Sequence, residues 1–148
     1  RYNADKEIAE LGAYLHDIAL VENVGTRDEH NVRGAEIAVS LLEGYDYPKD
    51  RIERVRLCVL HHRSSRNSTS IEETCVADAD ILAHFDNISM IFASAFVRNQ
   101  LKLENKDQLI EHFEKDFNDL SDMTKKWYRS RYETIMGVLF PDYDINRS

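Results

Sequence analysis

The sequence predicts an all-α fold, and three observations support this. Apolar residues recur at helical spacing along most of the chain, as Ile8, Leu11 and Leu15 do near its start. The 148 residues include only 5 Gly and 2 Pro, too few for the many turns of a β-sandwich or barrel. Hydrophobic residues make up 43% and charged residues 31%, which is a globular balance. We therefore expect a single helical domain over residues 1–148.

The first half of the chain predicts helices separated by polar segments. The expected elements are, in order, a helix over 4–16, a loop over 21–29, a helix over 30–43 ended by Gly44, a turn over 45–50, a third helix with an inward face from Ile52 to His62, and a loop over 63–70. Ala9 and Gly12 precede His16 on one face of the first helix. Because small side chains admit a neighbouring helix, we expect one to pack close to His16.

The second half predicts four more helices. Ser70-Ile-Glu-Glu73 matches a capping box and starts a helix that runs to about Asp86. Further helices are expected over 89–101, 107–120 and 121–140, the last ended by Pro141. The last helix is rich in aromatic residues that fit core packing, with a protein interface as the alternative. These residues are Trp127, Tyr128, Tyr132 and Phe140.

Composition excludes several classes of protein. Lys and Arg total 19 against 27 Asp and Glu, a net charge of −8 that argues against nucleic-acid binding. No apolar run approaches the roughly 20 residues that span a bilayer. Cys58 and Cys75 lack metal-binding spacing and are typical of a reduced, cytoplasmic protein. We expect no nucleic-acid or membrane partner, and homo-oligomerisation stays open.

Histidines and aspartates cluster in the first part of the chain. Imidazole and carboxylate groups together suit divalent ions such as Mn²⁺, Fe²⁺, Co²⁺ or Zn²⁺. Adjacent side chains on a helix diverge by about 100°, so His16 and Asp17 need further ligands from other helices. The candidates in chain order are His16, Asp17, His30, His61, His62, Asp78 and Asp80.

Simpler interpretations exist for some of these residues. His62 completes an apolar stripe with Val55 and Val59 and so fits a core position. Asp78 and Asp80 fit solvated helix charges, with His84 as a local partner of Asp80, and His112 fits the surface. The ordered convergence of a His-Asp pair, an inward His, a His-His pair and Asp-Ala-Asp favours a shared site.

Four segments, in this order, resemble the HD-domain metal-dependent phosphohydrolase superfamily. They are LGAYLHDIAL, DEHNVRGAEIAVSLL, VRLCVLHHRS and ADADILAHFD. The resemblance covers about residues 6–86 and leaves 87–140 as C-terminal helices. It implies a single helical HD-type bundle with a metal site between its helices.

The resemblance also implies roles for individual residues. His16, Asp17 and Asp80 match metal ligands, with Asp17 able to bridge two ions, whereas Asp78 does not occupy the matching place. His30 and His61 match residues that hold a second ion, and His62 ranks below His61. Asp17 and His61 are the candidate catalytic residues. One or two divalent ions are implied, with Mn, Fe, Co, Ni, Mg and Zn all open.

One departure from the family pattern concerns the region before the His-Asp pair. Family members supply a further histidine from an earlier helix, and this sequence has none before His16. We expect that the chain is an N-terminally truncated form of a longer protein that lacks the helix with this ligand. The alternative is a degenerate site.

The implied activity is hydrolysis of a phosphate ester or anhydride. Divalent ions would lower the pKa of a bound water toward about 7 and neutralise phosphoryl charge. Arg33, Arg63 and Arg66 lie near the ligands in sequence and could bind phosphate, with solvated arginines as the alternative.

A small phosphorylated substrate is therefore expected, with a nucleotide mono- or triphosphate first by analogy and guanosine tetraphosphate alarmone also open. Members that cleave cyclic dinucleotides carry a Gly-Tyr-Pro element that residues 63–70 lack. The alternatives are an HD-type di-iron oxygenase and a non-catalytic module that acts by protein association.

Overall fold

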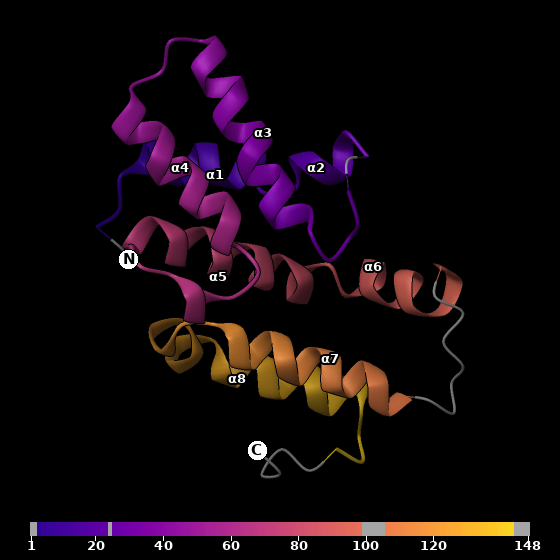
Figure 1. Ribbon diagram of the computed structural model, residues 1–148. Helices are drawn as coiled ribbons and strands as arrows, with labels where there is room; N and C mark the ends of the chain where they lie inside the picture. The colour runs from indigo at the N-terminus through magenta and orange to yellow at the C-terminus, as the bar shows by residue number, and fades with distance from the viewer. Residues whose placement is uncertain (1–2, 24, 99–105, 144–148) are drawn as a thin grey trace. The chain divides into compact units, whose positions relative to one another are not determined.

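The computed structural model describes residues 3–23, 25–98 and 106–143, with the side chains of Ser94, Val97 and Arg98 excluded. All regular structure in these ranges is helical, which confirms the predicted all-α fold (Figure 1). The elements are α1 Lys6–Leu15, α2 Ile18–Val21, α3 His30–Gly44, α4 Lys49–His61, the 3₁₀ segment η1 Ser65–Asn67, α5 Ile71–Asp86, α6 Ile88–Phe92, the π-helical segment η2 Ala93–Arg98, α7 Lys106–Asp119 and α8 Asp122–Leu139.

The tertiary contacts divide the chain into two compact units, residues 1–80 and 81–148. The boundary falls within α5, close to residue 86, where the sequence places the end of the motif-bearing region. Each unit has its own hydrophobic core. Within the described residues, no helix combines the length and apolarity that a bilayer crossing requires.

The core of the first unit is formed by α1, α3, α4 and the start of α5. Its fully buried members include Ile8, Ala38, Val55 and Cys58, and α5 adds the buried side chain of Val76. A Cβ atom added at Gly12 would lie 2.6 Å from Cys58 Cβ, so α1 and α4 touch where the sequence predicts a close helix contact. This packing brings α4 against the last turn of α1, next to His16.

The core of the second unit is mostly aromatic. The rings of Phe117 and Tyr132 stack with centroids 4.1 Å apart, and Phe85 contacts both Phe113 and Tyr128. Tyr128, Tyr132 and Phe140 are buried, which confirms core packing for most of the aromatic residues near the end of the chain, whereas Trp127 is exposed.

Local differences from the prediction have identifiable causes. The first helix begins at Lys6 rather than at residue 4, because the Asp5 carboxylate accepts from the Ile8 amide and caps it. A short helix, α2, covers residues 18–21, between the predicted helix over 4–16 and the predicted loop over 21–29. The predicted helix over 89–101 appears as α6 and η2, with residues 99–101 outside the described ranges.

Capping at the start of α5 follows the prediction only in part. Ser70 Oγ accepts from the Glu73 amide at 3.3 Å, as a capping box requires. The Glu73 carboxylate, however, accepts from the Thr69 amide at 3.0 Å, one residue before the position that the motif predicts. This places Glu73 close to the end of α4.

Candidate functional site

The candidate ligands of the first unit lie mainly where helices begin or end. His16 follows the last residue of α1, and Asp17 precedes α2. His30 is the first residue of α3, and His62 follows α4. Only Asp80 lies inside a helix, α5. Helix ends therefore bring together groups that the sequence separates by more than 60 residues.

Three of the histidine rings are held in the same way. The Nδ1 atoms of His16, His30 and His62 lie 2.7, 2.6 and 2.7 Å from backbone carbonyl oxygens three residues earlier in the chain. A carbonyl oxygen can only accept, so each Nδ1 carries the proton and donates. In the neutral rings, Nε2 is then the atom with the free lone pair. This arrangement is typical of histidines whose Nε2 binds a metal.

The Nε2 atoms converge on two carboxylates. Asp17 Oδ1 lies 3.3 Å from His30 Nε2 and 3.8 Å from His62 Nε2. Asp17 Oδ2 faces His16 Nε2 at 3.5 Å, and Asp80 Oδ1 lies at the same distance from that nitrogen. The two oxygens of Asp17 thus face different histidines, and Asp80 adds a second carboxylate beside His16.

The donor set fits a divalent transition ion. Asp17, His30 and His62 each offer a ligand atom, and these atoms lie within 4.8 Å of one another. His30 Nε2 and His62 Nε2 are only 3.0 Å apart, although both are acceptors in the neutral rings. A cation between them removes the repulsion of two facing lone pairs, and imidazole with carboxylate suits Mn, Fe, Co, Ni or Zn.

His62 has the most perturbed environment of the three histidines. Its side chain is 2% exposed, and this burial lowers the pKa of the imidazole. The neighbouring rings of His16 and His30 lower the pKa further, against the opposing effects of the Val59 carbonyl and of Asp80. The ring is therefore held neutral, which is the form that binds metals.

His61 is placed differently from His62. Its Nδ1 lies 2.6 Å from Oε2 of the buried Glu73. Hydrogen bonds from His61, from the Thr69 amide and from hydroxyl groups lower the pKa of Glu73 despite its burial, which acts to raise it. The cluster of Asp17, His30 and His62 contains His62 and not His61, whereas the sequence ranks His61 above His62 as a metal ligand.

This difference has a physical explanation. His62 is both the last member of the apolar stripe of α4 and the residue at its end, so its ring is buried while its Nε2 faces the site. The sequence pattern alone assigned it to the core. Glu73 was not among the predicted site residues, because the capping motif accounts for its presence without any role for His61.

The remaining candidates are spread around the site. Asp78 is buried and accepts a hydrogen bond from Ser65 Oγ, so it is not a solvated charge. Arg33 Nη1 pairs with Glu36 at 3.0 Å, and Arg63 Nη1 donates to the Asp28 carbonyl at 3.1 Å. Arg66 lies in η1 and is exposed. Binding of phosphate by these arginines stays a prediction.

The second unit contains another group of metal-ligating residues. His84 Nδ1 lies 2.9 Å from Asp116 Oδ2, whereas the sequence suggested Asp80 as a local partner. His112 Nε2 lies 3.6 Å from the same oxygen, and His112 is exposed as predicted. The sequence analysis did not predict that His84 and His112 lie together, because they are 28 positions apart.

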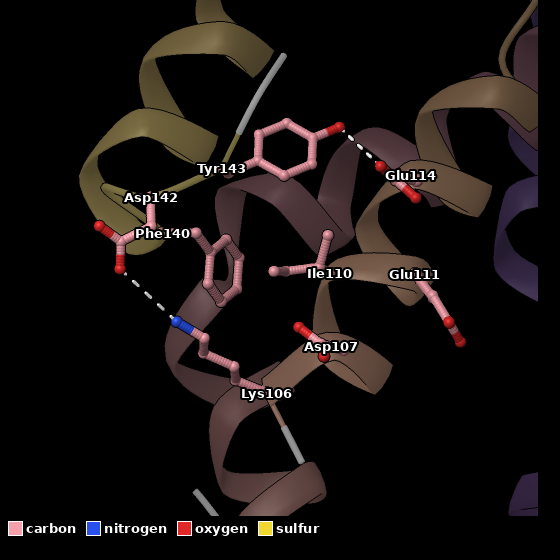
Figure 2. Close-up of a pocket in the computed structure, with 8 residues that line it drawn as sticks. All are labelled: Lys106, Asp107, Ile110, Glu111, Glu114, Phe140, Asp142 and Tyr143. Carbon is pink, nitrogen blue, oxygen red and sulfur yellow. Dashed lines mark hydrogen bonds and ion pairs between the residues drawn. The ribbon is translucent and has the colours of Figure 1, made fainter. Parts of the chain in front are cut away.

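A pocket of about 560 Å³ lies in the second unit and contains none of the predicted site residues (Figure 2). Its polar rim is mostly paired, because Tyr143 donates to Glu114 and Lys106 faces Asp142. The other lining residues are Asp107, Ile110, Glu111 and Phe140. An acidic lining of this kind gives no support to phosphate binding.

Comparison with known proteins agrees with the geometry of the first unit. The family model described as HD domain matches residues 1–84, more than half of the 148 residues. This range includes every residue of the His16–Asp17–His30–His62–Asp80 arrangement. Searches of curated proteins and of solved structures gave no significant match.

Proposed function

The chain belongs to the HD domain family, and from this premise we propose that it is a metal-dependent phosphohydrolase that cleaves a phosphate ester or anhydride of a small metabolite. The observation that carries the proposal is the convergence of three Nε2 atoms and two carboxylates in the first unit. The hydrogen bonds from the three Nδ1 atoms leave Nε2 of each neutral ring available to a metal, which supports the metal dependence of the proposed activity.

The residues proposed to hold the metal are His16, Asp17, His30, His62 and Asp80. The chemistry that a bound divalent cation supplies to such a site is Lewis acidity toward phosphoryl oxygens and deprotonation of water near neutral pH. Asp17 is the central residue, because its two oxygens face histidines on both sides. One or two ions are compatible with this set.

Asp17 is the most exposed of the proposed ligands. The side chains of His30 and His62 are 10% and 2% exposed, whereas that of Asp17 is 44% exposed. A phosphorylated substrate therefore approaches past Asp17 and His16. Because the chain carries a net charge of −8, an anion needs local positive charge to bind.

We assign part of that charge to Arg63. Its guanidinium has five N–H donors, and Nη1 donates to the Asp28 carbonyl at 3.1 Å, which joins residues 25–29 to the segment that begins with Arg63. Both segments adjoin ligands, since His30 and His62 flank them. Arg33 and Arg66 are the further candidates, and a nucleotide is the substrate that the family resemblance favours.

The test is a screen of phosphorylated metabolites with the complete reading frame, in the presence of added Mn²⁺, Co²⁺, Ni²⁺, Fe²⁺, Mg²⁺ or Zn²⁺. Phosphate release that requires a metal and is absent in Asp17→Asn supports the proposal. Asn is isosteric with Asp but lacks the charge, so loss of activity in this variant reflects lost ligation.

Other outcomes contradict it. Metal binding without hydrolysis of any phosphorylated compound, together with O₂ consumption by the iron-loaded protein, indicates an oxygenase. No binding of any of these metals indicates a non-catalytic module.

A further inference from the structure

The second unit holds a cluster that the proposed phosphohydrolase site does not use. His84 comes from the last turns of α5, and His112 and Asp116 come from α7. His112 and Asp116 are four residues apart, so they lie one turn apart on the same face of α7. The cluster lies entirely within residues 81–148 and shares no residue with the first site.

We propose that His84, His112 and Asp116 form a second metal site, one that binds Zn²⁺ or a similar divalent transition ion and links α5 to α7 within this unit. One nitrogen from each ring and one carboxylate oxygen lie within 4.8 Å of one another. Two imidazoles and one carboxylate are a donor set that zinc uses in proteins, with water in the fourth position.

The distances between donor atoms agree with a tetrahedral shell. Metal–nitrogen and metal–oxygen bonds of about 2.0–2.1 Å place neighbouring ligand atoms about 3.3 Å apart. Asp116 Oδ2 lies 2.9 Å from His84 Nδ1 and 3.6 Å from His112 Nε2, one distance on each side of that value. Small rotations of the two rings, with the helices unchanged, would equalise them.

Burial and charge at the cluster also favour a cation. The Asp116 side chain is only 8% exposed, and its Oδ2 faces both imidazoles. The His84 and His112 side chains are 43% and 46% exposed, so an ion can reach the cluster from solvent. Lys115, beside Asp116 in sequence, points its ammonium to Asp119 at 2.7 Å.

The simplest competing interpretation is a hydrogen bond between His84 and Asp116 with His112 as a bystander. That interpretation accounts for the 2.9 Å contact but leaves the approach of His112 unused. The rings of His84 and His112 have centroids 6.2 Å apart, with both facing one carboxylate. The two interpretations differ in whether Zn²⁺ affects both histidines.

Histidine footprinting on the full chain separates them. Diethylpyrocarbonate modifies exposed imidazoles, and mass spectrometry of peptides reports each histidine separately. We expect Zn²⁺ to slow modification of both His84 and His112 by at least about 10-fold, and Mg²⁺ to have no effect, because Mg²⁺ prefers oxygen ligands. Equal modification rates with and without Zn²⁺ overturn the proposal.

A binding measurement uses the full chain with Asp17→Asn, which removes the central ligand of the first site. We expect one equivalent of Zn²⁺ to remain bound, with affinity at least about 10- to 100-fold lower after the further change His112→Gln. Glu111→Gln is the matched control, since it changes the adjacent residue and should leave the affinity unchanged. Equal affinities in the two variants overturn the proposal, whatever the outcome for phosphate hydrolysis.

Discussion

Nε2 of His30 and Nε2 of His62 face each other at 3.0 Å. Both rings donate from Nδ1 to a backbone carbonyl, so in their neutral forms two lone pairs meet at hydrogen-bond distance. Only a cation or a shared proton makes this pair favourable. Asp17 Oδ1, 3.3 and 3.8 Å from the two nitrogens, supplies the balancing negative charge. The pair is therefore consistent with a bound cation or a shared proton, and this observation does not depend on the family match.

Asp17→Ala is expected to remove metal binding to the first site and, with it, phosphate hydrolysis. The carboxylate is the group that contacts both the His16 side and the His30–His62 side of the site. We expect metal affinity and turnover to fall by at least about 100-fold. Elemental analysis of the dialysed protein and a phosphate-release assay measure the two effects. Full metal content with undiminished turnover would refute the role of Asp17.

His62→Gln and His61→Gln are expected to differ. His62→Gln removes a ligand of the Asp17–His30–His62 cluster and should weaken metal binding by at least about 10-fold. His61→Gln removes the partner of buried Glu73 and should lower the free energy of unfolding by about 1–3 kcal/mol, with the metal content unchanged. Metal titration and chemical denaturation of both variants distinguish the roles. If His61→Gln loses the metal and His62→Gln keeps it, the order predicted from sequence is restored.

Arg63→Ala is expected to act on substrate binding. Since the exposed guanidinium is proposed to contact phosphate, its removal should raise KM by about 10-fold, with a smaller change in kcat. The matched control is Arg56→Ala, because Arg56 pairs with Glu53 within α4 and is not assigned to the site. Equal KM values for Arg63→Ala and the unchanged protein would remove Arg63 from the substrate site.

The ion pairs at the start of α1 predict a pH dependence of stability. A hydrogen bond from Arg51, together with the Ile8 amide and the charge of Arg54, lowers the pKa of Asp5 below its ordinary 3.8. Because the folded-state pKa is depressed, this contribution is fully present above the ordinary pKa and is lost as the pH falls through the folded value.

Asp5→Asn tests this contribution, since asparagine also caps helices but carries no charge. We expect the variant to be less stable than the unchanged protein at pH 7, and the two unfolding free energies to converge as the pH falls below about 4. Urea denaturation between pH 7 and pH 2.5 provides the comparison. A stability difference that does not change with pH would exclude the ion pairs as its cause.

Two glycines in helices predict opposite effects of the same substitution. At Gly12 the new methyl group would lie 2.6 Å from Cys58 Cβ, so overpacking should destabilise the protein by about 1–3 kcal/mol. At Gly137 an added methyl group would meet no atom of the described residues within 4 Å outside the adjacent backbone of α8, so Gly137→Ala should stabilise α8 by up to about 1 kcal/mol. Thermal denaturation of both variants measures the difference. A stabilised Gly12→Ala variant would show that α1 and α4 are not in close contact there.

The fold was largely predictable because it rests on periodicity, which the sequence carries directly. The predicted helix over 30–43 ends one residue before α3 does, and the predicted helix over 107–120 begins and ends one residue after α7. The short α2 was not predictable, since four residues hold too little of a period. The two-unit division also escaped prediction, because it falls inside α5 with no Pro, Gly or change of composition to mark it.

The site was predictable in its residue types but not in its geometry. The order of His16, Asp17, His30 and Asp80 could be read from motifs, whereas the choice between His61 and His62 depends on how the chain leaves α4. At that point the ring of His61 faces Glu73, whereas the ring of the next residue, His62, faces Asp17. The group of His84, His112 and Asp116 has no motif at all, since only tertiary packing joins it.

Each histidine ring of the first site is oriented by a hydrogen bond to the backbone carbonyl three residues earlier, at positions 13, 27 and 59. Any amino acid except one that distorts the turn offers the same oxygen. The exposed side chains at positions 13 and 27 can thus change without loss of the contact, whereas Val59 is also held by the core, and a four-residue fragment that ends in histidine is a transferable unit for designed metal sites.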